Sequence, residues 1–120
     1  MFIRHLRDCE EFTAGDNTIL RELFNPLKEH LNLRYSFAHA RVAPGGMTLL
    51  HRLATSEVYY ILEGTGEMEI DGEHRQVCPG AAIYIPPGSA QRIRNTGNVE
   101  LVFICIVDPA WRVEDEEVLE

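Results

Sequence analysis

Strand-length apolar segments alternate with turn signals through most of this chain, and this pattern leaves little room for any fold not built from β-sheets. Beyond Glu57 the apolar segments cover residues 58–62, 68–70, 81–85 and 101–107. Asp71 and Gly72 stand between alternating apolar residues, and this pair is a strong hairpin signal because the turn needs positive φ angles. The sequence therefore predicts antiparallel strands joined by tight turns.

Two further strands are expected in the first half of the chain. Residues 18–24 follow the turn signal Gly15-Asp16-Asn17, and residues 35–42 alternate larger with smaller side chains before a proline and two glycines. Between them, residues 27–31 predict at most a short helical turn within a loop. The helical content should therefore be very low.

The chain has 120 residues, which suits one domain with one hydrophobic core. No internal repeat or linker divides it. We expect a barrel core over about residues 17–108, a strand segment at residues 1–12 and an acidic tail at residues 109–120. The tail is expected to be solvated, and Trp111 to turn back over the barrel or toward a second subunit.

Two stretches with regularly placed glycines carry the polar residues of interest. The first contains Gly45, His51, Leu53, Glu57 and Gly64. The second has the same character, and its members are Gly80, Pro86, Gly88, Gln91 and Asn95.

The spacings of both stretches resemble the two motifs of the cupin superfamily, in the right order. Leu53 and Gln91 stand where that family usually has histidines that ligate a metal, so two of the usual ligands are replaced. The resemblance implies an all-β fold, namely an antiparallel double-sheet jelly-roll barrel. It also implies a metal site formed by His51, Glu57 and Gln91.

Strand periodicity predicts which side chains share a face, because residues an even number apart point the same way. Gln91, Ile93 and Asn95 then point inward together, as do Glu57, Tyr59 and Ile61, and likewise His51 and Leu53. On residues 35–42 the face with the smaller side chains is expected inside, and His39 outside. The expected cavity wall comprises Met47, Leu53, Ile93, Phe103 and Cys105.

His51, Glu57 and Gln91 allow two interpretations. An imidazole, a carboxylate and an amide oxygen can together coordinate a divalent ion such as Zn, Ni, Fe, Mn or Cu. The alternative is a metal-free polar cluster in which His51 and Gln91 satisfy the buried carboxylate by hydrogen bonds.

The predicted function depends on whether this site binds a metal. With a metal, the chain would be an isomerase, lyase or dioxygenase acting on a small organic substrate, with Tyr59 as proton donor or orienter. Without one, it would be a non-catalytic module that binds or senses a small molecule. A purely structural role is the third alternative.

Composition restricts the partners. The net charge is −8, and five acids fall in the last eight residues, so a concentrated basic face for nucleic acid is absent. No apolar segment approaches the length of a membrane span. Cys9, Cys78 and Cys105 are odd in number and widely spaced, which suits a reducing compartment, and we expect a cytoplasmic protein. Residues 1–12 are expected to pair or exchange strands in a homodimer.

Overall fold

The computed structural model describes residues 1–120 and consists almost entirely of β-strands. Two short 3₁₀ helices, η1 (Leu6–Asp8) and η2 (Val113–Asp115), are its only helical elements. The strands are β1 (Glu11–Thr13), β2 (Ile19–Phe24), β3 (Ser36–Val42), β4 (His51–Leu53), β5 (Ser56–Glu63), β6 (Gly66–Ile70), β7 (Glu73–Val77), β8 (Ala82–Ile85), β9 (Gln91–Asn95), β10 (Leu101–Asp108) and β11 (Glu116–Val118). No helix is long and apolar enough to cross a membrane.

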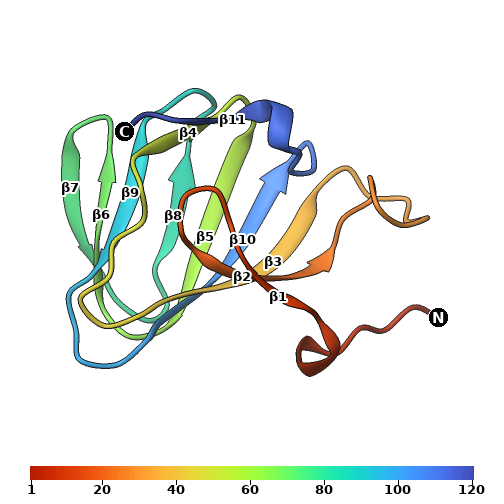
Figure 1. Ribbon diagram of the computed structural model, residues 1–120, viewed down its shortest axis with the longest axis horizontal. Coiled ribbons are helices and arrows are strands. Elements are labelled where there is room, and N and C mark those ends of the chain that lie inside the picture. Colours follow the sequence, from red (N-terminus) through yellow and green to blue (C-terminus); the bar gives the residue numbers. More distant parts are fainter.

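The strands form two antiparallel sheets that enclose one core (Figure 1). The six-stranded sheet has the order β1-β2-β3-β10-β5-β8, and the five-stranded sheet has the order β11-β4-β9-β6-β7. Strands that are consecutive in sequence often lie in different sheets, as in a jelly roll. The predicted all-β double-sheet barrel is confirmed.

The turns follow the predicted backbone chemistry. Asp71 and Gly72 join β6 to β7 with φ angles of 49° and 83°, so both occupy the positive-φ region that this hairpin turn requires. Gly64 has a φ of 80°, and a Cβ there would lie 2.5 Å from the Glu100 carbonyl oxygen. Glycine is therefore required at this crossing on steric grounds as well. Residues 27–31 form a turn region without a helix.

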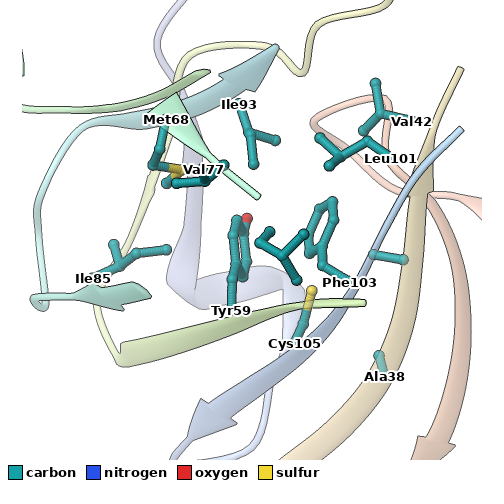
Figure 2. Close-up of a cluster of buried hydrophobic side chains, with 12 residues drawn as sticks. Ala38, Val42, Tyr59, Met68, Val77, Ile85, Ile93, Leu101, Phe103 and Cys105 are labelled. Carbon is teal, nitrogen blue, oxygen red and sulfur yellow. The ribbon is translucent and has the colours of Figure 1, made fainter. Parts of the chain in front are cut away.

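The core lies between the sheets and follows the predicted alternation. Ile61, Ile93 and Phe103 have no exposed surface. Ile93 of β9 and Phe103 of β10 face each other across this core (Figure 2). The Tyr59 and Phe103 rings pack with centroids 4.5 Å apart. Truncating an aromatic residue in such a core typically lowers the free energy of unfolding by about 3–5 kcal/mol. The core therefore fixes the sheet positions on which the polar side chains depend.

The C-terminal segment departs from the expectation of a solvated tail. β11 lies beside β4 at the edge of the five-stranded sheet (Figure 1). In this pairing Val118 stands opposite His51. Backbone hydrogen bonds from Ala54 to Asp115 and from Leu119 to Leu50 extend the pairing at both ends. The charges do not prevent this, because alternate residues of a strand face opposite sides: Glu117 stays exposed while Glu116 turns inward.

The N-terminal segment is docked on its own chain. β1 pairs with β2 at the edge of the six-stranded sheet, and the Phe2 ring packs edge-on against Phe24 at 5.7 Å. The predicted homodimer stays a prediction.

Candidate functional site

The three predicted ligand residues are buried on two different sheets. His51 begins β4 and stands opposite Gln91 of β9 in the five-stranded sheet, while Glu57 belongs to β5 in the other. Their exposed fractions are 3%, 0% and 7%. All three side chains therefore lie on inward faces, as strand periodicity predicted.

Gln91 joins the sheets through hydrogen bonds. Its amide nitrogen donates to Glu57 Oε1 at 2.7 Å, and its oxygen accepts from the Tyr59 hydroxyl at 3.1 Å. Both hydrogen-bonding ends of the carboxamide are thus used inside the protein. Tyr59, the predicted catalytic residue, orients Gln91 in this arrangement.

Burial controls the ionisation of these groups. Desolvation raises the pKa of Glu57 from its ordinary value of 4.5 to about 8; the hydrogen bond from Gln91 opposes this change, and the charges of Asp16 and Glu116 add to it. Desolvation, and then the Glu57 charge, also raise the pKa values of Tyr59 and Cys105 well above their ordinary values. Both groups are therefore neutral at physiological pH.

His51 is oriented by its own loop rather than by Glu57. Its Nδ1 donates to the Leu49 carbonyl oxygen at 2.8 Å, and its Nε2 lies 3.4 Å from Asp16 Oδ2. Asp16 lies in the β1–β2 turn. Its own backbone carbonyl accepts a hydrogen bond from the Leu49 amide at 2.8 Å. The predicted hydrogen bond between Gln91 and Glu57 is thus present, whereas His51 faces Asp16 and not Glu57.

A cavity of about 50 Å³ lies beside these groups. Of the predicted wall residues, Leu53 and Cys105 line it, and Ile93 and Phe103 are buried in the adjacent core. Met47 does not belong to the wall: its side chain is 46% exposed, because residue 47 only forms an isolated bridge with Arg94 before β4 begins.

Several cavity-lining residues come from segments where sequence patterns indicated no site. Asp16 and Glu116 carry carboxylates into the cavity, and Trp111 donates its indole N–H to Glu116 Oε2 at 2.9 Å. The turn signal at residues 15–17 was visible, but nothing in it indicated that Asp16 would reach His51. Trp111 does turn back over the barrel, as one of its two expected placements.

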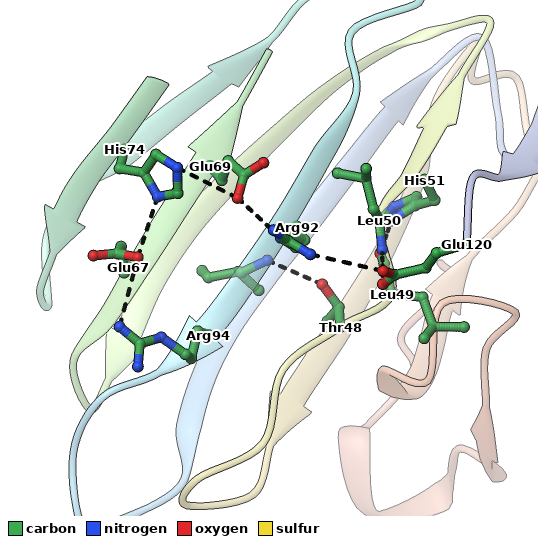
Figure 3. A network of polar contacts seen from close by, with 11 residues as sticks. Thr48, Leu49, Leu50, His51, Glu67, Glu69, His74, Arg92, Arg94 and Glu120 are labelled. Carbon is green, nitrogen blue, oxygen red and sulfur yellow. Dashed lines mark hydrogen bonds and ion pairs between the residues drawn. The ribbon is translucent and has the colours of Figure 1, made fainter. Parts of the chain in front are cut away.

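The outer face of the five-stranded sheet is a separate ionic network (Figure 3). Arg92 contacts Glu69 at 2.9 Å and Arg94 contacts Glu67 at 3.6 Å, so both arginines point away from the cavity as predicted. His74 lies between the same two glutamates. The two arginines therefore supply no positive charge to the cavity.

Asn95, the last residue of the second motif, has a structural role. Its amide nitrogen donates to the carbonyl oxygens of Val42 and Val99, and its side-chain oxygen accepts from the Gly97 amide. These bonds anchor the β9–β10 loop to β3.

The arrangement of His51, Glu57 and Gln91 does not fit the coordination of a divalent ion. No three histidine, cysteine, aspartate or glutamate side chains are grouped to hold a metal. The Gln91 oxygen, which would be the third ligand, accepts from Tyr59 instead. Metal binding stays a prediction that needs measurement.

Comparison with known proteins agrees with this fold. A family model described as Cupin domain matches residues 38–107, which is more than half of the chain. The chain therefore belongs to the cupin family, and the predicted small single-domain cupin is confirmed.

Individual relatives of this chain carry different functional descriptions. An uncharacterized protein of Methanocaldococcus jannaschii is 45% identical over 110 residues, which cover 91% of this chain and 87% of that protein. The oxalate-binding protein of Thermotoga maritima is 32% identical over 72 residues, covering 59% of this chain and 60% of that protein.

Solved structures show the same barrel. The polyketide cyclase RemF of Streptomyces resistomycificus has a TM-score of 0.82 at 21% identity, covering 100% of this chain and 86% of that one. A Cupin 2 conserved barrel domain protein of Salinispora arenicola has a TM-score of 0.78 at 23% identity, covering 95% and 91%. At these identities the likeness concerns the fold alone.

Proposed function

We propose that this cupin is a non-catalytic small-molecule-binding protein whose ligand occupies the cavity beside Glu57. The observation that carries the proposal is the composition of this cavity, in which buried polar groups converge within apolar walls. Such a combination is typical of ligand sites, where the walls select shape and a few polar groups select orientation.

The cavity volume restricts the ligand. At about 50 Å³ it is far smaller than the roughly 300–1,000 Å³ of pockets for drug-sized molecules. A ligand of a few non-hydrogen atoms is therefore supported over a sugar phosphate or a polycyclic substrate. The lack of a lining lysine or arginine also disfavours phosphate groups.

The hydrogen-bonding pattern favours binding over catalysis. Tyr59 holds its proton against Gln91, and burial keeps its pKa well above the ordinary value. A general acid works best when its pKa lies near the operating pH, and this hydroxyl is far from that condition. We therefore assign Tyr59 to the positioning of Gln91.

The chain provides its own reporter for a binding test, because its single tryptophan, Trp111, lines the cavity. A panel of small polar molecules of each charge type should include one that changes Trp111 fluorescence saturably. Ala38→Val, which adds two methyl groups to the cavity lining, should weaken that binding at least fivefold. Ala82→Val on the exposed edge strand β8 is the matched control and should leave it unchanged. Equal affinity in both variants would place binding elsewhere and refute the proposal.

A metal-dependent isomerase, lyase or dioxygenase is the second candidate. It is favoured by the hydrogen bond from His51 Nδ1 to Leu49, because a bond of this kind orients many metal-ligating histidines; Nε2 then faces Asp16 on the cavity wall. Gln91 would first have to release Tyr59. Elemental analysis of protein purified without an affinity tag tests this candidate: stoichiometric zinc, nickel, iron, manganese or copper that is lost in Glu57→Gln would support it.

A further inference from the structure

The charged groups in the cavity are of one sign. Four acids line it, namely Asp16, Glu22, Glu57 and Glu116, and no lysine or arginine does. Glu22 is compensated from outside, since Lys28 Nζ lies 2.8 Å from its Oε1. The other three acids have no lysine or arginine in contact, and only His51 approaches one of them, Asp16. An anionic ligand would therefore meet Asp16 and Glu116 with no lysine or arginine to compensate their charge.

Several carboxylate oxygens remain available to a ligand. Glu57 is 7% exposed, and only its Oε1 accepts a hydrogen bond, from Gln91, so Oε2 is left for the cavity that the residue lines. Glu116 accepts from the Trp111 indole through Oε2, and its Oε1 has no hydrogen-bond donor. Asp16 uses Oδ1 for the Thr18 amide, and its Oδ2 lies 3.4 Å from His51 Nε2. The cavity thus offers hydrogen-bond acceptors, which favours a ligand that donates hydrogen bonds.

The protein itself places an ammonium group against this type of surface. Lys28 Nζ, bound to Glu22, also lies over the Trp111 ring at 6.0 Å from its centroid. A carboxylate together with an aromatic face is a favourable environment for an alkylammonium ion, because the ring adds a cation–π attraction. Trp111 and the adjacent Glu116 offer the same pair of groups to a ligand in the cavity.

We propose that the ligand of this cavity is a small organic ammonium ion held by Asp16, Glu57, Glu116 and the ring of Trp111. This inference rests on the proposed binding function and names its ligand class. An ammonium group supplies up to three N–H donors, which matches the open carboxylate oxygens, and its short alkyl part contacts apolar walls such as Leu53 and Val107. Burial keeps a proton on Glu57 in the free protein below its pKa of about 8, and a cation in this position favours its ionised form, so Glu57 becomes a full acceptor on binding.

The test compares probes of similar size and different charge on the full chain. Methylammonium and ethylammonium chloride are titrated against sodium acetate and neutral acetamide at constant ionic strength. Trp111 fluorescence and its single indole N–H resonance are followed. We expect saturable changes with the ammonium ions alone. Glu116→Gln and Glu57→Gln should each weaken binding at least tenfold, while Glu114→Gln, the same change at an exposed residue of η2, should have no effect.

The outcomes separate this inference from the function beneath it. Saturable binding of acetate or acetamide without ammonium binding would overturn the ligand class and leave the binding function standing. A saturable response to MnCl₂ or ZnCl₂ with none to ammonium would also overturn it and favour the metal-dependent candidate. If no probe changes the indole N–H resonance of Trp111, both proposals are contradicted. If Glu114→Gln weakens binding as much as the cavity variants do, the loss of affinity follows from net charge alone. That result would refute the assignment of Asp16, Glu57 and Glu116 to the ligand site.

Discussion

At the scale of single residues, Glu57 is the most consequential side chain in the barrel. It is a carboxyl group placed between two sheets, 7% exposed, with one hydrogen-bond donor for two oxygens. Burial of this kind disfavours the charged form, and the pKa near 8 expresses that cost. Glu57 therefore couples the stability of the fold to pH.

Titration of Glu57 makes the folded state less stable as pH rises. Between pH 4.5, the ordinary pKa, and about 8, the folded protein holds a proton on Glu57 that the unfolded chain has lost. The free energy of unfolding therefore falls as pH rises through this window, at up to about 1.4 kcal/mol per pH unit for one group. Glu57→Gln keeps an acceptor for Gln91 and removes the titration. We expect the stability advantage of this variant over the wild type to grow from pH 5 to pH 8 in urea unfolding experiments.

Glu114→Gln serves as the control for this measurement, because it removes a carboxylate at an exposed position. It should leave the pH dependence of the wild type intact. Parallel pH profiles for the wild type and Glu57→Gln would contradict the raised pKa of Glu57.

At the scale of elements, β11 decides whether the cavity is complete. It covers the edge of β4 that would otherwise present unpaired backbone groups, and it carries Glu116 to the interior. Only three residues make the pairing, yet the backbone bonds at Ala54 and Leu119 lie outside the strand proper and lengthen the contact.

Truncation after Asp115 tests this role. The shortened chain loses the β4 pairing and the Glu116 contact with Trp111, so we expect the free energy of unfolding to fall by about 2–4 kcal/mol, at roughly 1 kcal/mol per lost hydrogen bond. Amide exchange at residues 51–53 should accelerate together with this loss. A double substitution of the exposed acids, Glu114→Gln with Glu117→Gln, separates charge from pairing and should change stability little. Unchanged exchange at β4 in the truncated chain would show that β11 is dispensable.

At the scale of the whole molecule, the open question is assembly. The edge strand β1 pairs with β2 on one side only, which leaves its other side available to a second copy. The Phe2–Phe24 contact holds the preceding segment against its own barrel, so edge pairing of two β1 strands is favoured over their exchange.

We therefore expect the intact chain to form a homodimer through this edge. Light scattering coupled to size-exclusion chromatography should give twice the chain mass of 13.7 kDa. A chain that begins at Ala14 should give the monomer mass. A monomer mass for the intact chain across micromolar concentrations would refute the dimer.

Much of the barrel could be predicted from local chemistry. The strands at β5, β8 and β10 begin and end within about two residues of their apolar runs, and the Asp71-Gly72 turn lies where positive φ angles were required. Alternation also placed Glu57, His51 and Gln91 on inward faces, because a strand leaves no other choice once one neighbour is buried. The small-residue face of β3 is likewise inside.

The acidic C-terminus could not be predicted in the same way. Five acids in eight residues resemble a solvated end, and the signal for β11 is too short to outweigh that pattern. The strand forms because the free edge of β4 provides hydrogen-bond partners, and that edge exists only after the barrel has closed.

The barrel and the inward direction of His51, Glu57 and Gln91 could be predicted from motif spacing, pleating and turn signals, because each of these involves residues close together in the chain. The contacts of these side chains depend on segments that only folding brings together. Asp16 and Glu116 lie 100 positions apart in the chain, and they line one cavity because the β1–β2 turn and β11 reach it from opposite ends of the chain. Local patterns carry no information about such a convergence, and the charge of the site depends on it.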